Sequence, residues 1–235
     1  MKSIFQNRWS ELFPNLPDAE TIFDLDRIER FHLFLVRENE KGGFFSKNDT
    51  SVILDRHLIE CALFAFKLST LGYVSRETKL ADVGTGPGLP GFLFSCLLNS
   101  PSLTLIDSQR RKLSLLEGSE LANGIEFVYS RVEDCPLHFS VVTCRAMVPY
   151  PWSLEVVTPI LKIGSLFCPF LGNPLNLDSK ERQKANSLGF ELKEILPLPE
   201  LEFLGKRHIR VLEKKHKEEK GFPRPWKTIL KEMQS

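Results

Sequence analysis

The sequence predicts an α/β fold: a doubly wound, mostly parallel sheet, preceded by an N-terminal helical cap and closed by a final antiparallel strand. The composition is globular, with 42% hydrophobic and 26% charged residues among 235. Two helical patterns come first, and short apolar runs alternating with helical stretches follow from residue 79. We expect a helical segment (1–75), a sheet-containing core (76–214) and a basic tail (215–235), together forming one compact domain.

The N-terminal third has the apolar spacing of amphipathic helices. Apolar residues recur at near-helical intervals over residues 18–39, and Asp18 is available as the N-cap. A second helix is expected over residues 52–71, where Gly72 ends it. Residues 41–50 contain glycine, asparagine and aspartate and are expected to form a loop.

Short apolar runs separated by turn residues predict the strands of the sheet. The expected strands are 79–83, 103–107, 126–129, 141–144, 165–169, 191–196 and 208–213. The expected helices between them are 91–98, 109–122, 154–161 and 179–188. Alternating strands and helices are typical of a parallel sheet covered on both faces, and the last two strands are expected to close it as a hairpin.

Composition also limits the classes of function. The five cysteines are odd in number and form no Cys-x-x-Cys pair, so we expect reduced thiols, no disulfide framework and no metal site. The uncharged stretch 83–106 is interrupted by four glycines and three prolines, which argues against a membrane span. The N-terminus has no apolar signal region, so we expect a cytoplasmic protein. The net charge is +1, so any nucleic-acid surface must be local.

The strongest local signal is Ala-Asp-Val-Gly-Thr-Gly-Pro-Gly-Leu-Pro-Gly at residues 81–91, which leaves a strand and enters a helix. Glycines allow the backbone to turn sharply and to approach a ligand at the carboxyl edge of the sheet. A plain tight turn is the alternative, but these glycines exceed what a turn requires. Leu89 stands where a dinucleotide fingerprint needs its last glycine, and there is no lysine between Lys79 and Lys112 to form a P-loop.

An acid follows at the end of the next strand. Asp107 lies 23 residues after Gly84, the distance expected for a carboxylate that accepts hydrogen bonds from ribose hydroxyls. Alone, Asp107 could equally be a helix N-cap. Together with the glycine loop, it indicates a ligand that contains ribose but no pyrophosphate.

These residues resemble a known family. The loop, with Leu-Ile-Asp-Ser at 105–108, is similar to the S-adenosylmethionine loop of class I methyltransferases. In particular, it resembles the bacterial small-subunit rRNA guanine-N7 methyltransferases called the glucose-inhibited division protein B family. Residues 55–58, 130–133, 142–146, 205–211 and 221–227 resemble further elements of that family, so the similarity covers about residues 20–230. It implies a Rossmann-like fold.

The resemblance implies a set of cofactor contacts. Gly84 and Leu89 would line the methionine and ribose end of S-adenosyl-L-methionine, and Asp107 would bind its ribose. Val132 and Glu133 would flank the adenine. The cofactor-binding candidates are Gly84, Thr85, Gly86, Gly88, Leu89, Asp107, Val132, Glu133 and Arg145. The alternatives are an ordinary surface acid for Glu133 and a strand-end salt bridge for Arg145.

The family activity implies methylation of guanine N7 in a 16S rRNA loop near the decoding region, on 16S rRNA or the small ribosomal subunit. Guanine N7 has a lone pair and no proton, so in-line methyl transfer needs no general base and we expect no catalytic residue. Cys144 lies inside an apolar run and is expected to be a core thiol rather than a nucleophile. The RNA-binding candidates are His57, Arg131, Tyr150, Arg224, Trp226 and Lys227.

The tail and the acceptor leave alternatives. Residues 206–232 hold ten Lys/Arg and four Asp/Glu, so this end is basic and either solvated or RNA-facing. If it faces RNA, removal of residues 215–235 should weaken RNA binding and leave cofactor affinity intact. Two other functions stay open: a methyltransferase acting on a small molecule or protein, and a non-catalytic ribosome-associated RNA-binding protein. We expect a monomer.

Overall fold

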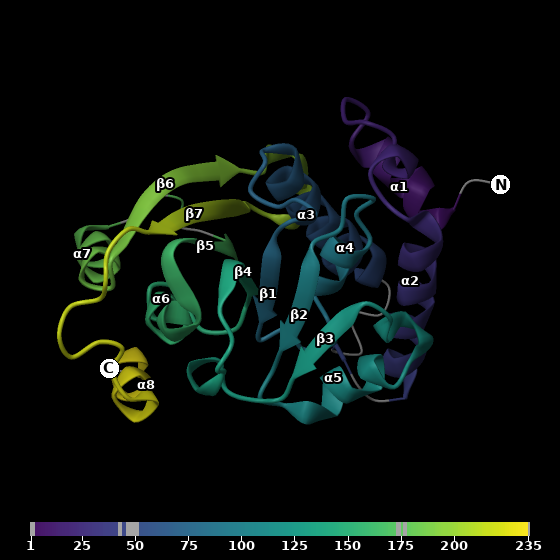
Figure 1. Ribbon diagram of the computed structural model, residues 1–235. Helices are drawn as coiled ribbons and strands as arrows, with labels where there is room; N and C mark the ends of the chain where they lie inside the picture. Colours follow the sequence, from purple (N-terminus) through teal and green to yellow (C-terminus); the bar gives the residue numbers. More distant parts are fainter. Residues whose placement is uncertain (1–2, 42–43, 46–51, 173–174, 176–177, 235) are drawn as a thin grey trace.

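The computed structural model describes residues 3–41, 44–45, 52–172, 175 and 178–234. A single sheet of seven strands crosses the molecule in the order β3-β2-β1-β4-β5-β7-β6 (Figure 1). The strands are β1 (Lys79–Val83), β2 (Ser102–Ile106), β3 (Ile125–Val128), β4 (Phe139–Arg145), β5 (Leu161–Leu171), β6 (Phe190–Pro197) and β7 (His208–Lys214). The first five are parallel, and β7 runs antiparallel between β5 and β6.

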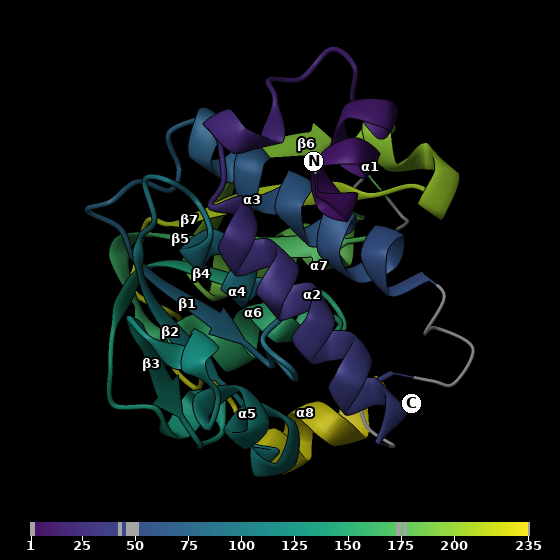
Figure 2. The same cartoon turned by 90° about the vertical axis from the view of Figure 1, so that its right-hand side faces the viewer.

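Helices cover both faces of this sheet (Figures 1 and 2). They are α1 (Ile4–Leu12), α2 (Leu25–Glu40), α3 (Glu60–Thr70), α4 (Gly91–Ser95), α5 (Arg110–Glu117), α6 (Trp152–Val157), α7 (Ser179–Ser187) and α8 (Trp226–Met233). Residues of α1 to α5 pack in one core, and residues of α6, α7 and α8 pack in a second core on the opposite face. Adjacent strand residues alternate between them, since Leu80 and Val141 join the first core and Ala81 and Val142 the second.

The predicted fold class is confirmed, and each predicted strand overlaps an observed one. The helix predicted over residues 18–39 is wrong at its start, because Asp18 makes no side-chain cap and precedes only a short 3₁₀ turn. Asp24 caps α2 instead, by accepting from Arg27 N at 3.0 Å. The helix predicted over 154–161 runs one residue too far, since Leu161 begins β5. Most of the loop predicted at 41–50 lies outside the described residues.

A π-helical segment, Leu54–Ile59, leads directly into α3 and faces the carboxyl edge of the sheet. Its start is fixed by α1, because Arg8 donates from Nε to Asp55 Oδ1 at 2.9 Å and from Nη2 to Oδ2 at 2.7 Å. π-helical turns are frequent at functional sites. Here the N-terminal helices therefore supply one wall of the site described below.

In the part of the chain that the structure describes, no helix is both long and apolar enough to cross a membrane. Within the same residues, no cluster of three or more histidine, cysteine or acidic side chains is arranged to hold a metal ion. All five cysteines are free and buried.

Candidate functional site

Two adjoining cavities lie at the carboxyl ends of β1, β2, β3 and β4. The larger, of about 630 Å³, is called the arginine cavity after Arg56, Arg145 and Arg207 in its wall. The smaller, of about 450 Å³, is called the acidic cavity after Asp107 and Glu133. The two share the wall residues Gly84, Gly86, Lys112, Ala146 and Val148. These shared residues form a neck, and most of them carry small side chains or none.

The glycine loop forms one side of this neck. Gly84 has a φ of +65°, and a Cβ there would lie 2.4 Å from Met147 Cγ, so only glycine fits. Gly86 has a φ of +57° and open space beside its Cα, because a Cβ would meet no heavy atom within 4 Å. The backbone at Gly86 is therefore bare toward the cavities, as a close approach to a ligand requires.

Two acids hold the loop in this shape. Asp107 accepts from Gly86 N at 2.8 Å and from Gln109 N at 2.7 Å. Asp82 is fully buried and accepts from Gly91 N and from Thr143 Oγ1, both at 2.9 Å. Burial raises the pKa of Asp82 to about 6 in spite of these hydrogen bonds, which act in the opposite direction. Asp82 is thus a structural support, whereas Asp107 lies in the cavity wall.

The acidic cavity continues along the segment after β3. Val132 and Glu133 both lie in its wall, as does Arg131. Arg131 donates from Nε to Glu133 Oε1 at 2.6 Å. On its other side, the Arg131 guanidinium lies 4.5 Å from the centroid of the Trp226 ring. Trp226, from α8, is itself part of this wall.

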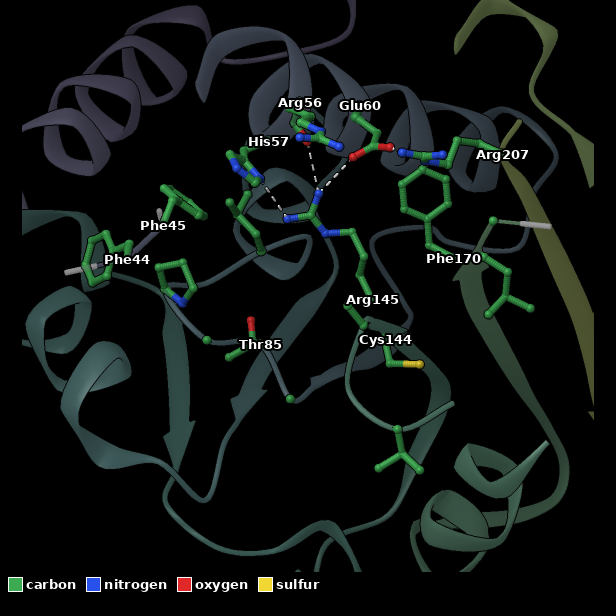
Figure 3. A pocket seen from close by; sticks show the side chains of 18 of the residues that line it. Phe44, Phe45, Arg56, His57, Glu60, Thr85, Cys144, Arg145, Phe170 and Arg207 are labelled. Carbon is green, nitrogen blue, oxygen red and sulfur yellow. Dashed lines mark hydrogen bonds and ion pairs between the residues drawn. The ribbon is translucent and has the colours of Figure 1, made fainter. Parts of the chain in front are cut away.

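The arginine cavity is organised by one carboxylate. Glu60 is 3% exposed and accepts from Arg145 Nη1 at 2.9 Å and from Arg207 Nε at 2.5 Å. Arg145 also donates to the backbone oxygen of Arg56 and lies 3.2 Å from His57 Nδ1 through its Nη2. Figure 3 shows Arg145 pointing toward His57 and Glu60, with Arg207 meeting Glu60 from the other side. Among the wall residues that the structure describes, Arg56, Arg145 and Arg207 outnumber Glu60, so this part of the wall carries a net positive charge.

Aromatic and apolar groups complete the arginine cavity. The His57 ring stacks on Phe45 at 3.9 Å between centroids. Tyr150 lies in the wall with the Arg210 guanidinium 4.4 Å from its ring centroid. Cys144 borders the cavity but is 3% exposed, and burial raises the pKa of its thiol well above the ordinary value. This environment favours the core thiol predicted from the sequence over a nucleophile.

Most of the cofactor candidates come together around the neck. Thr85, Leu89 and Arg145 lie in the wall of the arginine cavity, and Asp107, Val132 and Glu133 in that of the acidic cavity. Gly88 lies in neither wall: a Cβ on it would meet Leu116 Cδ2 at 2.6 Å, so this glycine permits packing against α5.

The RNA-binding candidates are dispersed over the molecule. His57 and Tyr150 lie in the arginine cavity and Arg131 and Trp226 in the acidic cavity. Arg224 is held in ion pairs with Glu155 and Glu232. Lys227 is exposed on the first turn of α8.

Sequence reasoning missed three residues of the site. Glu60, Lys112 and Arg207 line the cavities but were given no role. Arg207 lies in Gly-Lys-Arg-His, a motif that resembles the family's last strand. This motif could have indicated a role for Arg207. Lys112 is held by the backbone oxygen of Phe44 at 2.8 Å. The Glu60 contact spans 147 residues of sequence, so no local pattern could reveal it.

The strand order, the glycine loop after β1 and the acid after β2 define a Rossmann-like class I methyltransferase. Solved structures share the fold. A TehB-like SAM-dependent methyltransferase from Corynebacterium glutamicum aligns with a TM-score of 0.51 at 14% identity, covering 72% of this chain and 94% of that one. A ribosomal protein L11 methylase from Lactobacillus delbrueckii subsp. bulgaricus gives 0.50 at 16% identity, covering 66% and 77%.

Sequence comparison identifies the family within that class. The family described as "GidB: rRNA small subunit methyltransferase G" matches residues 24–209, and the chain belongs to it. A relative from Leptospira biflexa, named ribosomal RNA small subunit methyltransferase G, is 51% identical over 96% of this chain and 93% of its own length. A relative of the same name from Leptospira interrogans is 42% identical over 99% of this chain and 92% of its own length. Another from Desulfitobacterium hafniense is 33% identical over 72% of this chain and 74% of its own length.

Proposed function

We propose that this protein transfers a methyl group from S-adenosyl-L-methionine to guanine N7 in a loop of 16S rRNA near the decoding region. The names of its relatives support the rRNA substrate. One structural observation carries the proposal: an acidic cavity suited to a nucleoside and a basic cavity suited to RNA meet at a neck of small residues. A methyl group could pass between two ligands there.

The residues present fit the cofactor. When bound, S-adenosylmethionine supplies an electrophilic methyl carbon on a sulfonium. Asp107 stands where it can accept from ribose hydroxyls, since each of its oxygens keeps a lone pair beyond the one engaged by the backbone. Val132 offers an apolar surface for adenine, and Glu133 an acceptor for its amino group. Bare backbone at Gly86 leaves room for the sulfonium end.

Methyl transfer to guanine N7 requires few catalytic groups from the protein. Guanine N7 already has its lone pair, so the protein has to align donor and acceptor and exclude water. Cys144, beside the arginine cavity, is buried and its thiol pKa is raised, which argues against this residue as a nucleophile. We therefore assign no general base.

The arginine cavity would hold the RNA side. Arg145, which the sequence assigned to the cofactor, pairs with Glu60 and is here proposed to face the RNA together with Arg207. Their two positive charges around one carboxylate leave a net positive wall for phosphates. His57 and Tyr150 add flat rings beside the neck, suited to stacking on a base. Acting on ribosomal RNA, the protein would work in the cytoplasm, as a monomer.

Nucleoside mass spectrometry of small-subunit rRNA, with and without the gene, tests the proposal. We expect the level of 7-methylguanosine to fall by one residue per 16S rRNA when the gene is removed. An unchanged level would defeat the rRNA assignment and favour another acceptor. Titration of the purified protein with S-adenosylmethionine is the companion measurement: no binding, or binding unaffected by Gly86→Asp, would favour a non-catalytic RNA-binding protein.

A further inference from the structure

The C-terminal segment, defined here as residues 221–233, folds back on the core, and Figures 1 and 2 show α8 at the base of the molecule. Ile229 is 2% exposed and belongs to the second core. Arg224 contacts Glu155 of α6 three times: its N donates at 2.7 Å, its Nε at 2.8 Å and its Nη2 at 2.8 Å. The segment is therefore docked through both apolar and ionic contacts.

The Glu155 carboxylate makes this docking specific. It is fully buried and also pairs with Lys184 Nζ at 2.5 Å. Burial by itself would raise the pKa of Glu155, and the hydrogen bonds from Arg224 and Lys184 outweigh it and lower the pKa. A buried carboxylate lowers the stability of the fold unless it is paired. Arg224 therefore has a structural role.

Two basic residues of the tail, residues 215–235, are paired with acids of the protein itself. Lys215 pairs with Glu213, and Arg224 pairs with Glu155 and Glu232. Paired cations attract phosphate less than free ones do. This pairing weakens the case for Arg224 as a contact to RNA.

Docking brings Trp226 into the wall of the acidic cavity, beside Val132 and Glu133. The Arg131 guanidinium stacks 4.5 Å from the Trp226 ring centroid and pairs with Glu133 Oε1 at 2.6 Å. Trp226, Arg131 and Glu133 thus form one connected edge of the cavity. An aromatic face beside an apolar side chain and a hydrogen-bond acceptor suits a purine ring.

We propose that the C-terminal segment completes the adenosine half of the cofactor site, with Trp226 as its outer wall and Arg131 as the residue that positions both Trp226 and Glu133. The inference rests on the proposed use of S-adenosylmethionine. It reverses the outcome expected from the sequence for removal of the tail, because loss of the segment would lower cofactor affinity.

Equilibrium calorimetry on the full chain tests this inference, with S-adenosylmethionine and 5′-methylthioadenosine as two separate ligands. Trp226→Ala should weaken the binding of both by about tenfold, equal to about 1.4 kcal/mol. The two losses should match, because 5′-methylthioadenosine keeps the adenosine part and lacks the amino-acid part. Trp226→Phe, which retains an aromatic face, should stay within about twofold of the wild type. Lys231→Ala, at an exposed position of the same helix, should leave both affinities unchanged.

A second variant tests whether a loss of affinity reflects lost packing. Trp226→Leu keeps apolar packing against the second core but removes the aromatic face, and it should lose affinity as Trp226→Ala does. Wild-type affinity in both variants, with weaker RNA binding, would overturn the inference and return the segment to RNA. If the wild type binds neither ligand, the proposed cofactor use fails instead, so the two failures are distinguishable.

Discussion

Replacing Glu60 with glutamine removes the one carboxylate that Arg145 and Arg207 share. The side chain keeps its size and one acceptor oxygen, but it loses the negative charge between two guanidinium groups. Both arginines then lose the carboxylate that they share. We expect a loss of stability and a loss of the cavity's geometry.

The magnitude follows from burial. Removing one partner of a buried ion pair costs about 3–5 kcal/mol, and the Glu60 side chain is only 4% exposed. The Arg145 and Arg207 side chains are 19% and 23% exposed, so water can partly solvate them after the change. We therefore expect the lower end, a decrease of about 3 kcal/mol in the free energy of unfolding.

Urea denaturation at pH 7 measures this change. The slope of the unfolding free energy against urea concentration should stay unaltered, which indicates that the unfolded state is the same. The matched control is Asp26→Asn, since Asp26 and Arg30 form an exposed pair at 2.9 Å with side chains 78% and 43% exposed. Such pairs contribute less than about 1 kcal/mol. A Glu60→Gln variant within about 1 kcal/mol of the wild type would refute the reasoning.

Three further predictions concern the site and the sheet. Asp107→Ala should weaken S-adenosylmethionine binding at least tenfold, about 1.4 kcal/mol, as measured by calorimetry. The substitution removes the ribose acceptor and the hydrogen bond from Gly86 N. An unchanged affinity would count against Asp107 as the ribose acceptor. Cys144→Ala should retain methyl transfer to rRNA within about threefold, about 0.7 kcal/mol, in an assay with labelled cofactor, and complete inactivation would indicate a reactive thiol. Burial, reinforced by Arg210, lowers the pKa of His208 to about 4. Because the unfolded imidazole protonates near 6.5, the free energy of unfolding should fall as the pH drops from 6.5 toward 4, by up to about 3 kcal/mol more than in His208→Gln. If urea denaturation gave the wild type and His208→Gln the same pH dependence, this role of His208 would be contradicted.

The fold was predictable because its signals are local. Each strand of the parallel sheet is a short apolar run between turn residues, and β1 was predicted with its observed bounds. The helix ends were less predictable, since two aspartates, Asp18 and Asp24, compete as the cap of α2 and only the second accepts a backbone hydrogen bond. α1 and α8 were not predicted at all.

The site was predictable where it follows the chain and not where it depends on tertiary contacts. The glycine loop and Asp107 follow directly after strands, and Glu133 lies five residues after β3, so the sheet places all of them at its carboxyl edge. Glu60 and Trp226 enter the site from elements distant in sequence. Their roles depend on how α3 and α8 dock, which no local spacing encodes.

The shared neck has a consequence for inhibitor design. Because the two cavities adjoin over Gly84, Gly86 and Ala146, a single molecule could carry a nucleoside in one and a purine in the other, joined by a short linker. Linking makes the second contact intramolecular, and overall affinity can exceed either part by about 10²–10⁴ when the linker matches the span. Because the two cavities share wall residues, short linkers should be favoured over long ones.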